Sequence, residues 1–143
     1  MKTIFFFFLI LFVQLSQAQT LTGTFTSSDI STNFNTYEIS CYGSNVININ
    51  LPSGGQYIVN NVNVAYNMTA IGSGWMADQR SQIAFLNTNT VESTEAIGVG
   101  SGPGTFNYNR NISIANGTYS GGTSLSFQLR ARRVFEGTPG CNT

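Results

Sequence analysis

The sequence contains no histidine, and this absence removes several classes of chemistry together. Histidine is the commonest general base, a frequent metal ligand and the proton acceptor in Ser-His and Cys-His nucleophile pairs. Those catalytic arrangements are therefore excluded. Basic residues are also few, with six lysines and arginines together in 143 residues. Because a protein that neutralises many phosphates needs an excess of positive charge, we expect no nucleic-acid partner.

Long hydrophobic runs are scarce too, and the one that exists lies at the N-terminus. Lys2 precedes an unbroken apolar run over residues 4–13, and the small residue Ala18 follows it closely. This is the pattern of a secretory signal with its cleavage site. We expect residues 1–18 to be removed and residues 19–143 to form a single domain that is secreted or held at the cell surface. The run is too short to span a bilayer, so we expect no membrane-spanning segment.

Charge is low in the expected mature chain. Lys2 is the only lysine and belongs to the signal, so five arginines remain against six carboxylates, a net charge of −1. A disordered chain would carry more charge and fewer apolar residues than the 41% found in the full sequence. The mature chain is therefore expected to fold.

Cysteine is limited to two residues, and export would deliver both to an oxidising compartment. We expect one disulfide between Cys41 and Cys141, with two unrelated free thiols as the alternative. Closing a loop of about 100 residues stabilises a fold by up to roughly 4.7 kcal/mol in the chain-entropy treatment.

Proline is rare, whereas Asn, Thr, Ser and Gly are abundant, with Val, Ile, Phe and Tyr between them. This composition is typical of strands and turns. Strict alternation of apolar and polar residues predicts half-buried strands over residues 106–114, 125–132, 46–51 and 62–66. Shorter candidates cover residues 21–26, 37–41, 82–86 and 95–99.

No window of ten or more residues shows a helical period with caps, so an α/β fold is not expected. About eight strands at this spacing predict an all-β fold, an antiparallel two-sheet sandwich that is jelly-roll-like and carries one disulfide. The glycine-rich segment 98–104 should connect the sheets or lead the chain around a corner. In the last long strand we expect the apolar residues in the core and the polar residues in solvent, namely Leu125, Phe127, Leu129 and Ala131 against Ser126, Gln128, Arg130 and Arg132.

Several segments carry a resemblance to known proteins. The Phe-rich signal ending in Gln17-Ala18-Gln19 resembles those of exported Bacteroidota proteins, and the Asn-rich body is similar to small β-sandwich modules of their secreted and surface proteins. Segments 62–66, 74–83 and 129–133, with the following Gly140-Cys141, carry this likeness. They are also similar to the jelly-roll P domain of secreted subtilisin-like proteases. The resemblance implies a non-catalytic module.

That resemblance also implies a further strand after Cys141, whereas the sequence ends at Thr143. We expect either a fragment of a longer protein or a module in which one sheet edge stays open. Because an open edge presents unpaired backbone groups, edge-strand pairing with another chain or domain is a candidate interaction.

Four residues near one glycine-flanked loop suggest a ligand site: Trp75, Asp78 and Arg80, with Tyr66 in the strand before them. An exposed aromatic ring with polar neighbours can bind a sugar by stacking and hydrogen bonds. In the structural alternative, Trp75 caps the sandwich core while Asp78 pairs with Arg80 or caps a turn.

Acidic residues near loops are few: Asp29, Asp78, Glu92 and Glu95. Calcium needs several oxygen ligands, and no Asp-x-Asp run supplies them. We expect no metal or other cofactor, calcium being the one ion that these residues leave open. Glu92 and Glu95 lie in a Thr/Ser-rich turn where solvated charges are the usual explanation, so no catalytic carboxylate pair and no enzyme are expected.

Arginines cluster near the end of the chain. Arg130 and Arg132 share the outward parity of their strand and are candidate ligand-binding residues for an acidic glycan or for carboxylates of a partner. The alternative is that these charges keep a long strand from pairing with other chains. Without a ligand role, truncation of Arg132 to alanine should change stability by no more than about 0.5 kcal/mol.

Arg110 differs from that cluster because it has the inward parity of its strand. A buried guanidinium must be paired. The nearest candidates in the sequence are Glu38 and Glu136.

The leading hypothesis is a non-catalytic, adhesion-type β-sandwich that acts as a secreted or cell-surface binding or accessory module, with an extracellular protein or glycan as partner. The runner-up is a carbohydrate-binding module centred on Trp75, Tyr66, Asp78 and Arg80. The third hypothesis, from the P-domain resemblance, is a stabiliser of a secreted protease.

Overall fold

The computed structural model describes residues 20–23, 30–43, 45–135 and 140–141. Within these ranges the chain forms ten strands, one four-residue α-helix and one 3-10 turn. The expected all-β sandwich is therefore confirmed. The expected signal, residues 1–18, lies outside the described residues. None of the described helices is long and apolar enough to cross a membrane.

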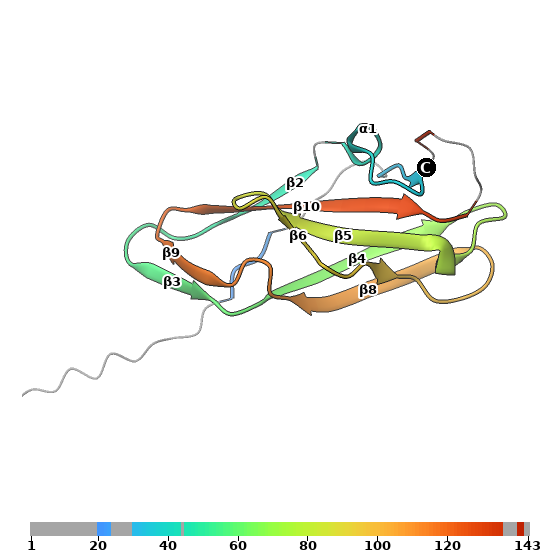
Figure 1. Ribbon diagram of the computed structural model, residues 1–143. Coiled ribbons are helices and arrows are strands. Elements are labelled where there is room, and N and C mark those ends of the chain that lie inside the picture. The colour runs from blue at the N-terminus through green and yellow to red at the C-terminus, as the bar shows by residue number, and fades with distance from the viewer. Residues whose placement is uncertain (1–19, 24–29, 44, 136–139, 142–143) are drawn as a thin grey trace, which may run out of the picture.

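One layer of the sandwich is a six-stranded sheet built around β10 (Ser124–Arg133). This strand pairs antiparallel with β5 (Gln79–Phe85) on one side and with β2 (Val46–Asn50) on the other. Three two-residue strands complete the sheet: β1 (Asn33–Phe34), which runs parallel to β10, β6 (Thr90–Val91) and β7 (Ala96–Ile97). Figure 1 shows this layer edge-on.

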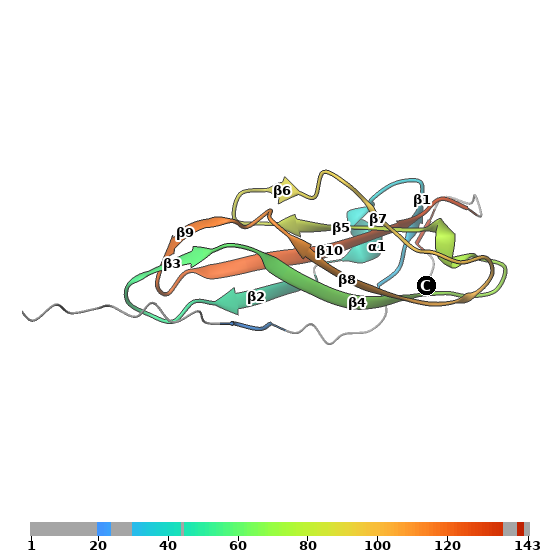
Figure 2. The same ribbon diagram turned by 90° about the horizontal axis from the view of Figure 1, so that it is seen from below.

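The other layer is a long two-stranded ribbon, which lies below the first layer in Figure 1. β4 (Val62–Ala70) and β8 (Gly104–Ile112) pair antiparallel along their whole length. At one end the ribbon continues as β3 (Gln56–Val59) paired with β9 (Gly117–Ser120). Figure 2 shows β4 and β8 side by side across β10.

The core forms because each long strand turns its apolar residues toward the other layer. Along β4 every second residue is half-buried and the residues between are exposed, as the alternation predicts. Phe85 is fully buried, and its ring centre lies 5.1 Å from that of Phe127. Leu51, Ile83, Ile112, Ala115 and Leu125 complete the buried cluster.

The face of β10 that points away from the ribbon is covered rather than open to solvent. The helix α1 (Ile39–Tyr42) lies above this face in Figure 1, and the expected disulfide between Cys41 and Cys141 is present. Gln128, expected in solvent, is buried there and donates to the carbonyl of Gly43 at 3.0 Å. The prediction of a strand over residues 37–41 was wrong, because residues 39–41 are helical.

Candidate functional site

The loops at one end of the sandwich meet at η1 (Met76–Asp78), on the right in Figure 1. The segment 98–103 connects β7 in one layer to β8 in the other, as expected, and packs against η1. The amide of Met76 donates to the carbonyl of Gly102 at 3.1 Å. Gly98 approaches so closely that a Cβ atom there would lie 2.1 Å from the carbonyl oxygen of Met76. We call segments 71–78 and 97–103 the η1 loops.

Exposed apolar side chains gather on the η1 loops. Four of the seven large hydrophobic side chains that are exposed among the described residues belong to them: Ile71, Trp75, Ile97 and Val99. Trp75 is 51% exposed, so it does not cap the core. Trp75 therefore presents an aromatic surface to solvent.

Asp78 holds the turn that carries Trp75. Its Oδ2 accepts a hydrogen bond from the Trp75 amide at 3.2 Å, and its own amide donates to the Trp75 carbonyl at 3.0 Å. The turn-capping alternative for Asp78 is thus what the structure shows. The indole is presented on a fixed backbone.

Arg80 also holds the backbone at this end of the sandwich. Its Nη1 donates to the carbonyls of Ala77 at 2.6 Å and Gln79 at 2.9 Å, and its Nε lies 3.9 Å from an oxygen of Glu95. These contacts occupy the guanidinium. Arg80 therefore binds the backbone carbonyls around η1.

Tyr66 points into the sandwich and not toward the η1 loops. Its ring stacks on Tyr108 with centres 4.8 Å apart, and its hydroxyl lies 2.6 Å from Oγ of Ser81. The four residues that the sequence suggested as a sugar site are therefore divided. Trp75 and Asp78 lie at the surface turn, while Tyr66 belongs to the interior.

Arg110 has the inward position that its parity predicts, but its partner is Glu92. Nε donates to one carboxylate oxygen at 2.9 Å and Nη2 to the other at 2.6 Å, while Nη1 donates to the Tyr66 hydroxyl at 2.8 Å. The predicted partners Glu38 and Glu136 were wrong: Glu38 is exposed, and Glu136 lies outside the described residues. The reason is that the segment after β6 brings Glu92 beside β8.

Glu92 was expected to be a solvated charge, and this too is corrected. Its side chain is 9% exposed, and its Oε2 also accepts the amide of Ile83 at 2.6 Å. The carboxylate therefore joins β5 to β8, one strand from each layer. The ion pair therefore links the two layers.

Burial and charge set the chemistry of this interior cluster. Burial raises the pKa of Tyr66, and burial together with Tyr66 raises the pKa of Tyr108 to about 12. Burial opposes the charge of Arg110, but hydrogen bonds to Glu92 and Tyr66 outweigh it and raise the guanidinium pKa. A tyrosine with a raised pKa keeps its proton at neutral pH and so does not accept one there, and Ser81 is fully buried. The cluster therefore lacks an activated nucleophile.

Arg132, expected to face solvent, is instead held in a second ion pair. Its Nε and Nη2 each donate to Glu95 at 2.8 Å, its guanidinium lies 5.4 Å from the ring centre of Tyr37, and its side chain is 16% exposed. The reason is that Tyr37 and Glu95 cover this face of β10. The expectation of a nearly neutral Arg132→Ala change is therefore withdrawn. Arg130 is half-buried, with its Nε 3.3 Å from Oε1 of Gln128.

Acid should weaken this second pair. Burial would raise the pKa of Glu95, but the hydrogen bonds from Arg132 and the charges of Arg132 and Arg80 outweigh it and lower the pKa below the ordinary 4.5. The unfolded chain then binds a proton more readily than the folded chain, so this stabilisation is present above about pH 4.5 and is lost as pH falls through the folded value. Urea unfolding at about pH 7 and about pH 3 should show a smaller loss of stability for Glu95→Gln than for wild type. Glu38→Gln, at an exposed carboxylate, is the control and should lose as much stability as wild type. An equal loss in Glu95→Gln and wild type would show that the Glu95 carboxylate is not stabilised in the folded chain.

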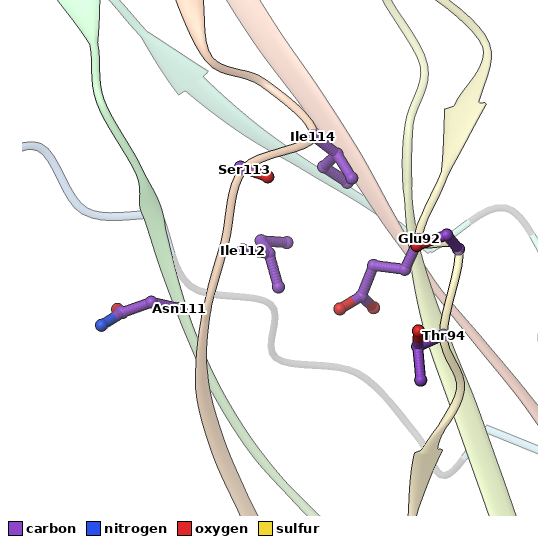
Figure 3. Close-up of a pocket in the computed structure, with 7 residues that line it drawn as sticks. Glu92, Thr94, Asn111, Ile112, Ser113 and Ile114 are labelled. Atoms are coloured by element: carbon purple, nitrogen blue, oxygen red, sulfur yellow. The ribbon is translucent and has the colours of Figure 1, made fainter.

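A shallow hollow of about 180 Å³ lies between the end of β8 and the segment after β6. Figure 3 shows Ile112 and Glu92 facing each other across it. Its lining also includes Ser93, Thr94, Asn111, Ser113 and Ile114. Because the Glu92 carboxylate is already paired, the hollow offers apolar and amide surface and no free charge.

Acidic and cysteine side chains do not assemble as metal ligands anywhere in the part of the chain that the structure describes. Asp29, one of the candidate calcium ligands, falls outside that part. Sequence reasoning missed the roles of Glu92 and Glu95, since both lie in a turn whose composition gives no sign of burial.

No family model, curated protein or solved structure matches this chain.

Proposed function

We propose that this chain is a non-catalytic, secreted or cell-surface β-sandwich that binds an extracellular protein or glycan through its η1 loops. The observation that carries the proposal is the half-exposed ring of Trp75 on a turn that Asp78 fixes. Exposed aromatic residues on rigid loops bind partners at little cost in conformational entropy.

The surroundings of Trp75 favour a contact surface over a reaction centre. Ile71, Ile97 and Val99 are also exposed on the same loops, and clusters of exposed apolar side chains mark interaction sites. The ionisable groups nearby are engaged: Asp78 with the Trp75 amide, and Arg80 with backbone carbonyls and Glu95. A partner would thus be recognised by apolar contact with a few hydrogen bonds at the rim.

A carbohydrate-binding module is the second candidate, favoured by the same exposed indole. A flat aromatic ring can stack on a sugar face while loop amides supply hydrogen bonds. Tyr66 has no part in this version, because its ring is stacked inside the sandwich. A neutral glycan is the matching class, since the nearby arginine is already paired.

The test is binding of wild type and Trp75→Ala to a glycan array and to an array of extracellular proteins. Truncation of a central tryptophan costs 2 kcal/mol or more in such interfaces, so we expect affinity to fall by roughly 30-fold or more. Ile58→Ala is the control, because Ile58 is exposed on β3 at the far end of the sandwich. Glycan hits that require Trp75 favour the second candidate, whereas protein hits favour the first. A ligand bound equally by both variants would refute a role for the η1 loops.

A further inference from the structure

The two layers of the sandwich have very different edges. The six-stranded sheet ends in strands of two residues, such as β1, β6 and β7, apart from the five-residue β2. The ribbon ends in β4 and β8, which are nine residues each and pair with one another at every position. Neither strand makes a further backbone hydrogen bond with the rest of the described chain. On its outer side, each therefore has a long row of backbone groups that no other described residue pairs with.

Both strands also lack the features by which proteins normally protect such edges. Neither contains proline, and the single charged residue is Arg110, which points inward to Glu92. Outward-facing charges and prolines are the usual protection against strand pairing. The outward residues of β8 are uncharged throughout: Thr105, Asn107, Asn109 and Asn111.

These outward side chains can pair with copies of themselves. Across the ribbon, Nδ2 of Asn63 already donates to Oδ1 of Asn109 at 3.0 Å and to Oδ1 of Asn111 at 3.1 Å. Each asparagine amide carries donors and an acceptor, so an asparagine can bond another asparagine in either direction. A second β8 beside the first would repeat the pairing that β4 now provides.

A hollow borders the end of β8. The hollow of about 180 Å³ separates residues 111–114 from the segment 92–94, so the neighbouring chain does not fill this position. Figure 3 shows the open space beside Ile112. Three of the four outward residues of β8 are asparagines, whereas β4 has two, Asn63 and Asn67, so β8 is the more self-complementary of the two edges.

We propose that β8 pairs antiparallel with β8 of a second copy of this chain, forming a closed dimer about a two-fold axis. A row of alternating amide and carbonyl groups is complemented by another extended strand, and a two-fold axis uses the same edge on both copies. If the two strands overlap fully, Asn107 of one copy lies opposite Asn109 of the other. The small residues Gly104 and Thr105 of each copy then lie beside the hollow of the other copy. This inference does not depend on the η1 loops.

The test is the mass of the protein in solution, measured by analytical ultracentrifugation over a range of concentrations. Wild type should reach twice the monomer mass at high concentration. The double variant Asn107→Lys/Asn109→Lys places like charges opposite one another and should stay monomeric. The matched control Ala65→Lys/Asn67→Lys puts the same two charges on the same face of β4 and should still dimerise.

Other outcomes overturn the proposal. A wild type that is monomeric at its highest soluble concentration refutes it, and so does a dimer that only the β4 variant disrupts or that neither variant affects. Amide hydrogen exchange of wild type provides a test that needs no substitution. Amides of β8 should exchange more slowly at high than at low concentration, and unchanged exchange there would also reject the paired edge.

Discussion

Phe127→Ala is expected to lower the free energy of unfolding by about 3 to 5 kcal/mol, the usual cost of emptying a large core aromatic site. Phe127 is 5% exposed, and its ring packs against Phe85, which also contacts Tyr119 edge-on with ring centres 6.2 Å apart. Truncation would leave a cavity between β10 and β5 that these rings cannot fill. Since single domains are stable by about 5 to 15 kcal/mol, the loss would be a large share of the total.

Denaturant unfolding followed by circular dichroism measures this loss as a fall in midpoint at constant slope. Phe135→Ala is a matched control, because it makes the same truncation at a residue that is 56% exposed. We expect the control to change stability by no more than about 0.5 kcal/mol. Equal midpoints for the two variants would show that the ring of Phe127 is not in the core.

The fold was largely predictable because its long strands alternate strictly in sequence. Residues 106–114 and 125–132 form most of β8 and β10, and the apolar parity of each faces the other layer. Several short strands were missed for the opposite reason, although the predicted strand over residues 95–99 contains β7. A two-residue strand such as β6 carries no period, and β9 (Gly117–Ser120) contains a single large apolar residue, Tyr119.

The polar contacts were the less predictable part, since they join residues that are distant in the sequence. The alternation of residues along β8 predicts that Arg110 faces inward. It does not predict the partner Glu92, which is 18 residues away in the sequence, because that contact depends on how the segment after β6 crosses to β8. For Arg132, parity predicts the correct face of β10 and the wrong environment, because Tyr37 and Glu95 cover that face. The alternation of apolar and polar residues shows which face of a strand meets the other layer. It does not show that a further segment of the chain covers the opposite face.

Glu92→Ala is expected to destabilise the fold by about 3 kcal/mol, the lower end of the cost of removing one partner from a buried ion pair. The change removes two hydrogen bonds to Arg110 and the acceptor of the Ile83 amide. Arg110 would then keep its charge in the interior with the Tyr66 hydroxyl as its remaining partner. The loss is at the lower end because the Arg110 side chain retains some contact with solvent.

A double substitution distinguishes the energetic contribution of the ion pair from that of the volume that its side chains fill. Replacing a buried pair by apolar residues of similar volume is often neutral or stabilising, because the desolvation of both charges is avoided. Glu92→Leu/Arg110→Met should therefore recover most of the stability lost in Glu92→Ala, in the same denaturant assay. Glu38→Ala, at an exposed carboxylate, should leave the midpoint almost unchanged. If the double variant is instead less stable than Glu92→Ala, the pair contributes net favourable energy between the two layers, and the desolvation argument fails for this protein.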